Sequence, residues 1–199
     1  MHTFDKLADR EYWKHIRELW THSEERSGTS PWLISLLKAP RGERDVLMTS
    51  EEHATLAALP DRGTLYRGIT FFPGDPLKYA RGMSWTNDLG MAAYFAHPSG
   101  WLAGGVLTAE VPRWRVLAYF QERGECEVVI DPRRISYRVH PMPIEEALDL
   151  SADALGRLEE HVDGQLRRDK ETRDAWDAAL LRDPFSAKAI GTDRSRLSI

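Results

Sequence analysis

A block of short apolar runs occupies the middle of the chain, between residues 62 and 140, and helical patterns lie on both sides of it. The runs have the length of β-strands, and Gly, Pro and charged residues separate them, as in TLYRGI, GGVLTAEV and RVLAYF. In residues 1–60 and 143–190, apolar side chains instead recur at the spacing of helices. This order predicts an α+β fold with helices at both ends of a strand-rich core.

The flanking segments contain specific helix signals. In the run DREYWKHIRELW, Trp13, Ile16 and Trp20 follow helical spacing, and we interpret them as core; the alternative is an aromatic ligand cage. Thr49, with Glu52 three residues later, predicts a capping box that begins a further helix. Two helices are predicted near the C-terminus. The first begins at the cap candidate Ser151 and carries Leu155, Leu158, Val162 and Leu166, and the second carries Trp176 and Leu180.

Length and composition favour one globular domain over residues 1–199, because a chain of this size can bury a sizeable core. The formal net charge is −4, so no basic field drives non-specific binding to nucleic acid. No apolar run approaches the ~20 residues that span a bilayer, and the first residues lack the apolar region of a secretory signal. Cys126 is the only cysteine, which excludes an internal disulfide and fits a cytoplasmic location. The seven histidines form no H-E-x-x-H pair, so we expect no metal site.

Three polar features interrupt the apolar runs: Arg67 in LYRG, Ser84 and Thr86 in SWT, and Glu125 and Glu127 in GECE. Each feature also has an ordinary structural interpretation. Arg67 would form an internal salt bridge, the SWT run would be a strand end that passes into a helix cap, and the two glutamates would lie at a solvated strand end. Because strand side chains alternate between faces, the two glutamates are expected on one face of a strand. Like charges this close repel each other, so they need either free water or a chemical use.

The order Arg, S-x-T, E-x-E, with each motif on a strand, resembles the R-S-E class of ADP-ribosyltransferases. The three motifs are Tyr66-Arg67-Gly68, Ser84-Trp85-Thr86 and Glu125-Cys126-Glu127. As in that family, a helix follows the second motif, and the turn YFQERG stands where the family carries its substrate-recognition loop. The resemblance covers about residues 62–135. In its small size and compact motif spacing, the chain is most similar to phage or prophage members of the family. The close spacing of the first two motifs and the bulk of Trp85 depart from many members.

The resemblance implies the ADP-ribosyltransferase fold, with a small twisted β core that is mixed or antiparallel, and a site for NAD as a substrate. Cleavage of NAD at the nicotinamide bond creates an oxocarbenium-like ribose, and Glu127 is expected to stabilise its charge through the ribose 2′-OH. Ser84 is expected to orient Glu127 by a hydrogen bond, and Thr86 to support the strand or contact NAD. Arg67 is expected to hold a phosphate of the dinucleotide through charge-assisted bonds.

Four further residues are implied on the NAD side of this site. Gly68 lacks a side chain and lets the backbone approach the nicotinamide amide, and Tyr66 precedes the arginine in the same motif. Either Phe95 or Trp85 stacks on the nicotinamide; the alternative for both is ordinary core packing.

In the resembling family, E-x-E marks enzymes that modify arginine. The arginine pKa of roughly 12.5–13.8 makes its guanidinium a poor nucleophile, and Glu125 would position it and remove a proton. The sequence therefore predicts a mono-ADP-ribosyltransferase that takes ADP-ribose from NAD and transfers it to a protein arginine. The alternatives are an NAD glycohydrolase, a nucleic-acid ADP-ribosyltransferase and a non-catalytic NAD-binding module of the same fold. No membrane partner is expected, and a phage-encoded member would act in the host-cell cytoplasm.

Overall fold

The computed structural model describes residues 3–22, 30–71, 77, 80–97, 103–121 and 124–182. It divides the chain into two compact units, residues 1–158 and residues 159–199, where the sequence predicts one domain. The first unit contains the described sheet, and the second begins within the last helix.

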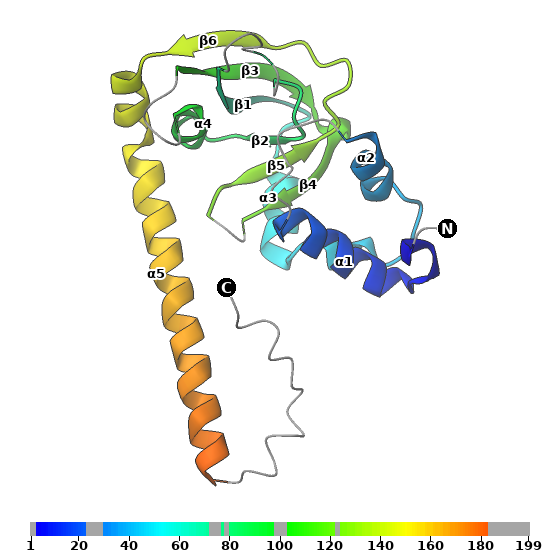
Figure 1. Cartoon of the computed structure of the whole chain (residues 1–199). Coiled ribbons are helices and arrows are strands. Elements are labelled where there is room, and N and C mark those ends of the chain that lie inside the picture. Colours follow the sequence, from blue (N-terminus) through cyan, green and yellow to red (C-terminus); the bar gives the residue numbers. More distant parts are fainter. Residues whose placement is uncertain are drawn as a thin grey trace. The chain divides into compact units, whose positions relative to one another are not determined.

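Figure 1 shows the elements, which follow the predicted order of helices, strands and helices. The helices are η1 (Thr3–Lys6), α1 (Asp9–His22), α2 (Pro31–Leu37), η2 (Arg44–Leu47), α3 (Ser50–Ala58), α4 (Leu89–Ala96), η3 (Arg113–Arg115) and α5 (Ile144–Arg182). The strands are β1 (Arg62–Thr70), β2 (Ser84–Thr86), β3 (Gly104–Pro112), β4 (Val116–Phe120), β5 (Glu127–Ile130) and β6 (Arg138–Met142).

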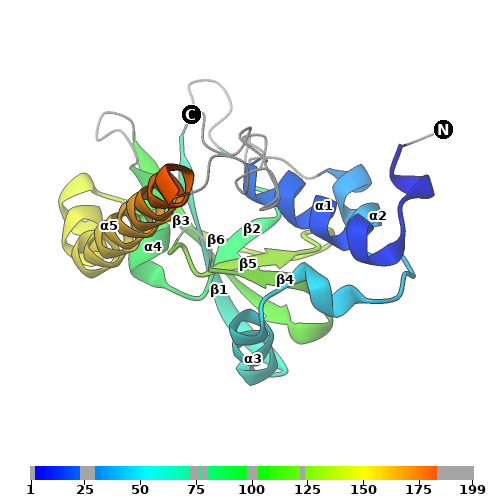
Figure 2. The same cartoon turned by 90° about the horizontal axis from the view of Figure 1, so that it is seen from below.

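The strands form a six-stranded sheet in the order β4-β5-β2-β1-β3-β6, and every neighbouring pair is antiparallel. β1 and β3 pair along their whole length, from Arg62 opposite Pro112 to Thr70 opposite Gly104. The short β2 lies between β1 and β5, so the three strands that carry the polar motifs are neighbours (Figure 2). The predicted α+β class is confirmed, and the sheet is antiparallel.

The N-terminal helices pack through the residues whose spacing predicts them. Trp13, Ile16 and Trp20 of α1 are each at most 2% exposed, which confirms their interpretation as core. α3 begins at the predicted capping box. The Thr49 hydroxyl accepts a hydrogen bond from the Glu52 N–H at 3.2 Å, and the Glu52 carboxylate accepts one from the Thr49 N–H at 2.7 Å.

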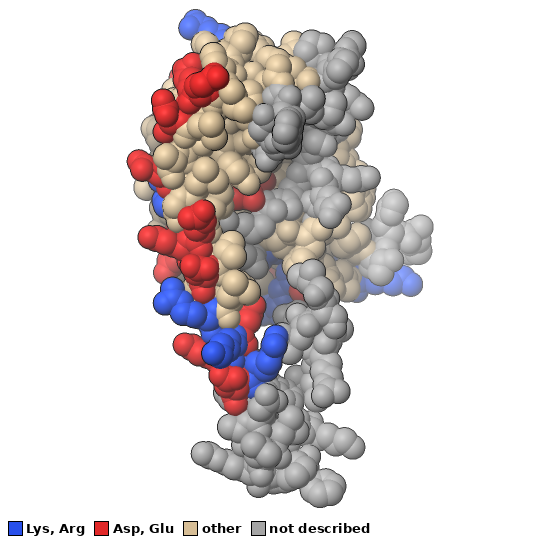
Figure 3. All heavy atoms as spheres, turned by 60° about the vertical axis from the view of Figure 1, so that its left-hand side comes forward, with Lys and Arg blue, Asp and Glu red and all other residues tan. Residues whose placement is uncertain are grey.

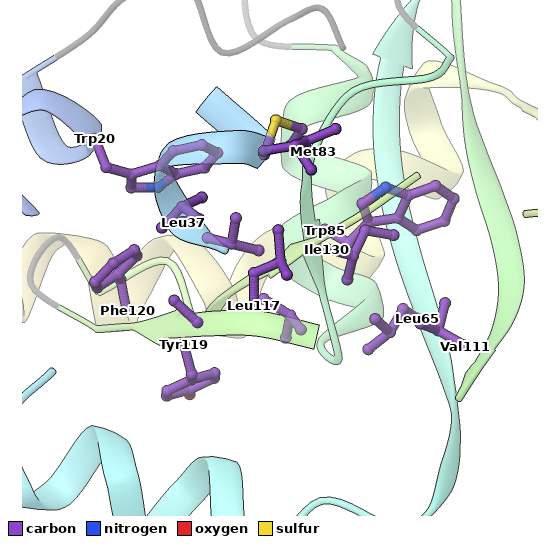
Figure 4. Packing of buried hydrophobic residues seen from close by; sticks show 14 of the residues in the cluster. Trp20, Leu37, Leu65, Met83, Trp85, Val111, Leu117, Tyr119, Phe120 and Ile130 are labelled. Carbon is purple, nitrogen blue, oxygen red and sulfur yellow. The ribbon is translucent and has the colours of Figure 1, made fainter. Parts of the chain in front are cut away.

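Two hydrophobic clusters lie against the described part of the sheet. The larger one joins α1 and α2 to the strands, and Figure 4 shows part of it, from Trp20 and Phe120 to Trp85 and Leu65. The smaller one brings α4 onto β3 and β6. Its buried residues are Ala92, Ala93, Ala96, Val106, Met142 and Ala147. Because the helix presents alanines, its backbone comes close to the sheet.

Gly68 of β1 marks this close approach. A Cβ atom there would lie 2.1 Å from the Ala92 carbonyl oxygen and 2.6 Å from the Ala96 nitrogen, so backbone would have to move. We expect Gly68→Ala to lower the free energy of unfolding by about 1–3 kcal/mol, the range for overpacked cores. Urea denaturation measures this change. Gly156→Ala in α5 is the control, because nothing lies within 4 Å of its Cβ position and Ala favours a helix. Equal effects of the two substitutions would contradict the packing role.

The C-terminal segment forms one helix over its described length, so the prediction of two helices is wrong. Ser151 is not a cap; it is buried within α5, and its hydroxyl donates to the Leu148 carbonyl at 3.3 Å. The helix begins at Ile144, with Glu145 and Glu146 in the first turn, where carboxylates favour the helix dipole. Between residues 144 and 182 the sequence contains no proline that would interrupt the helix.

Charged side chains follow α5 in two blocks. Acidic residues are frequent from residue 145 to 160 and Lys and Arg from 167 to 173, and both kinds are visible in Figure 3. Val162 and Leu166 of the predicted apolar stripe are 53% and 62% exposed. In the part of the chain that the structure describes, no helix combines the length and apolar character needed to cross a bilayer. The predicted helical residues 183–190 lie outside the described residues.

Candidate functional site

One row of residues crosses the sheet at the level of the three motifs. Tyr66 of β1 lies opposite Thr86 of β2, Thr86 lies opposite Glu127 of β5, and Glu127 lies opposite Phe120 of β4. Residues directly opposite each other in antiparallel strands carry neighbouring side chains on one face of the sheet. The sheet order therefore brings together motif residues that are about 60 positions apart in the chain.

Glu127 is a buried carboxylate with a specific hydrogen-bond donor. It is 5% exposed, and its Oε2 atom accepts a bond from the indole Nε1–H of Trp20 at 2.9 Å. The Trp20 ring in turn stacks on Phe120, with ring centroids 6.4 Å apart. The sequence predicts Ser84 as the donor to Glu127, but the donor that the structure records is Trp20. Helical spacing assigns Trp20 to the core and cannot show that its N–H faces a carboxylate.

Arg67 lies on β1, which β2 separates from the strand of Glu127, and interacts electrostatically with Glu127. Its side chain is half-buried, and its Nη1 donates to the Ser84 backbone carbonyl. Burial lowers the pKa of Arg67 to about 10, and the negative charge of Glu127 opposes that shift. The guanidinium therefore stays charged at neutral pH. Gly82 leaves room for it, because a Cβ atom at that position would lie 2.2 Å from Arg67 Nη2.

The S-x-T motif serves the site through its backbone and through the start of α4. Ser84 offers its carbonyl to Arg67, as described above. The Thr86 hydroxyl accepts a bond from the Asp88 N–H at 3.0 Å, and the Asp88 carboxylate caps α4 by accepting one from the Met91 N–H at 3.1 Å. Of the two roles predicted for Thr86, support of the strand end is the one that the contacts favour.

The prediction that Glu125 and Glu127 share a strand face is wrong. β5 begins at Glu127, and Glu125 lies half-buried in the bend before it. Gly124 and Cys126 have φ angles of 73° and 49°, in the left-handed region. A left-handed residue between the two glutamates interrupts the alternation of side chains that the prediction assumes. Residues 122 and 123 of the predicted recognition turn lie outside the described residues.

The connection that leads to Glu125 is attached at its start to the N-terminal helices. Glu52 of α3 is 2% exposed and accepts a bond from the Gln121 N–H at 2.9 Å. Arg17 of α1 donates to both Glu52 oxygens, at 2.7 and 3.1 Å. Burial alone would raise the pKa of Glu52, but the bonds from Arg17, Gln121 and Thr49 hold it below its ordinary value.

The aromatic residues predicted beside the nicotinamide differ in their surroundings. Trp85 is 3% exposed, lies in the core near Leu65, and donates its indole N–H to the Gly82 carbonyl at 2.9 Å (Figure 4). Its structure therefore corresponds to the core alternative. Phe95 is 38% exposed and makes an edge-to-face contact with Tyr94. Gly68 is used for packing against α4, as its surroundings show.

Within the described residues, no group of three or more His, Cys, Asp or Glu side chains is arranged to hold a metal ion. Comparison of the chain with protein-family models, with curated proteins and with solved structures found no match. The functional assignment therefore depends on the chemistry of the site and on the three motifs.

Proposed function

We propose that this protein is a mono-ADP-ribosyltransferase that cleaves NAD and transfers ADP-ribose to a protein arginine. The observation that supports this most directly is a buried carboxylate, Glu127, that interacts electrostatically with a half-buried guanidinium, Arg67, across strands separated only by β2. Charged groups held in a largely apolar sheet are costly unless they serve a purpose. Their order along the chain and across the strands fits the R-S-E motif set. The lone cysteine fits a reducing, cytoplasmic setting.

In the proposed reaction, the bond between ribose C1′ and the nicotinamide nitrogen breaks, and its electron pair leaves with nicotinamide. Positive charge then builds up on C1′ and the ring oxygen. A carboxylate that is fixed before the reaction stabilises this charge without reorganisation. Glu127 meets that condition because it is buried and its Oε2 atom is bonded to Trp20.

An arginine nitrogen of the acceptor forms the new bond to C1′ and loses one proton. We assign proton removal to Glu125, which is half-buried two residues before Glu127. Because Glu125 lies in a bend and not on β5, it occupies the kind of loop position from which binding and catalytic residues commonly act.

Glycohydrolysis of NAD, with water as the acceptor, is the second candidate function. The position of Glu125 outside the strand favours it, because this carboxylate is not held beside Glu127 by strand geometry. Nicotinamide release with and without polyarginine separates the candidates. A transferase labels polyarginine from adenylate-labelled NAD, a glycohydrolase yields free labelled ADP-ribose, and a binding module gives a melting shift with NAD but no nicotinamide.

Arg67 provides a test of how the dinucleotide is bound. Arg67→Lys keeps the charge but loses the planar fork that grips a phosphate, so we expect a raised KM for NAD with little change in kcat. Steady-state nicotinamide release measures both parameters. Arg81→Lys, at an exposed arginine outside the motifs, is the control. The phosphate-binding role is contradicted if Arg67→Lys leaves KM unchanged, or if it lowers the melting temperature while NAD has no effect on wild-type melting.

A further inference from the structure

Trp20 connects the helical N-terminal segment to the carboxylate at the centre of the site. It lies in the last turn of α1, 107 positions from Glu127. Its indole N–H donates a hydrogen bond to Glu127 Oε2 at 2.9 Å. We infer that Trp20 is a positioning residue that holds the Glu127 carboxylate in its reactive orientation. This inference rests on the proposed function, and it makes α1 a part of the site and not only a cover for the core.

The surroundings of the indole fix its position. Trp20 is 2% exposed, and its ring stacks on Phe120, which lies directly opposite Glu127 in the neighbouring strand. The Arg17 guanidinium lies over the Phe120 ring, 5.3 Å from its centroid, and also binds Glu52. The indole is therefore held on several sides, and so is the direction of the hydrogen bond that it donates.

A donor fixed in this way matters for the proposed chemistry. A glutamate side chain has several rotamers, and only some place a carboxylate oxygen where the ribose charge develops. One hydrogen bond from a rigid indole removes part of that freedom at Oε2. The other carboxylate oxygen, Oε1, is then held at a set position relative to β5. In the proposed reaction a substrate hydroxyl would bind Oε1 at that position.

The same helix contains a matched control. Trp13 is 0% exposed, and its indole Nε1–H donates to the Gly42 carbonyl at 2.6 Å. Replacement of either tryptophan by phenylalanine keeps an aromatic ring and removes one buried indole donor. A purely structural role would make the two substitutions similar in activity once their stability is taken into account. A positioning role confines the loss of activity to Trp20.

The experiment measures kcat and KM for nicotinamide release, together with melting temperature, on the full chain with Trp20→Phe or Trp13→Phe. We expect Trp20→Phe to lower kcat by about 10–100-fold, as removal of a group that orients a functional ligand commonly does, with KM nearly unchanged. Trp13→Phe should lower the melting temperature about as much as Trp20→Phe does, but it should leave kcat within about twofold of wild type.

A double variant separates positioning from general loss of structure. In the Glu127→Gln background, Trp20→Phe should cause little further loss, because its effect passes through the carboxylate. The inference is overturned if Trp20→Phe and Trp13→Phe reduce kcat equally, or if Trp20→Phe lowers activity by the same factor with and without Glu127. Absence of nicotinamide release by the wild-type protein would instead overturn the proposed function, and the inference with it.

Discussion

Glu127→Gln should reduce NAD turnover by roughly 10²–10³-fold, the effect of removing one preorganised electrostatic group. Glutamine keeps the shape of the side chain and an oxygen that can accept from Trp20, but it lacks the negative charge that stabilises the oxocarbenium-like ribose. Because that charge develops only in the transition state, kcat should fall much more than NAD affinity. Nicotinamide release gives kcat, and the melting shift with NAD reports binding.

Glu51→Gln is the control for this substitution. Glu51 is an exposed glutamate in the first turn of α3, so the same chemical change occurs away from the site. We expect its turnover to equal that of wild type. Near-normal NAD cleavage by Glu127→Gln, in a folded protein, would show that the assignment of this carboxylate is wrong.

Glu125→Gln should abolish transfer to arginine while slow cleavage of NAD by water continues. Water needs less activation than a guanidinium, and Glu127 remains to stabilise the charge on ribose. Loss of a general base costs typically 10²–10⁴-fold, and we expect a loss of about that size in transfer alone. Both reactions are measured on one preparation, as nicotinamide released and as label on polyarginine.

The ratio of the two rates decides the role of Glu125. Equal loss of cleavage and transfer would make this residue part of the NAD site or of the fold. No loss of either would leave it a half-buried residue of the bend before β5 with no part in either reaction. Transfer that falls much further than cleavage supports arginine as the acceptor.

Much of the fold follows from local signals in the sequence. The capping box at Thr49 and the burial of Trp13 depend on residues within one helix, where spacing is a direct guide. Gly and Pro bound the strand runs, so the order of helices and strands along the chain could be predicted. That order gives the α+β class. The start of α5 at Ile144 does not follow from the sequence signals, because Ser151 has the character of a cap but its hydroxyl bonds within the helix.

The candidate site was only partly predictable, for two physical reasons. Strand alternation predicts a common face for Glu125 and Glu127. Cys126 between them adopts a left-handed conformation although it is not a glycine, so no residue type in the sequence signals the interruption. The donor to Glu127 comes from α1, and a contact over 107 positions depends on tertiary packing. A tryptophan at a core position and one that also serves a carboxylate have the same spacing in a sequence.

The most direct test of the central claim is a time course of nicotinamide formation from NAD by the purified wild-type chain. We expect free nicotinamide to accumulate beyond one equivalent of protein, since the reaction releases one molecule at each turnover. The rate should fall by roughly 10²–10³-fold in Glu127→Gln prepared in the same way. Nicotinamide that does not exceed a protein-free control, from a folded protein saturated with NAD, would contradict the claim.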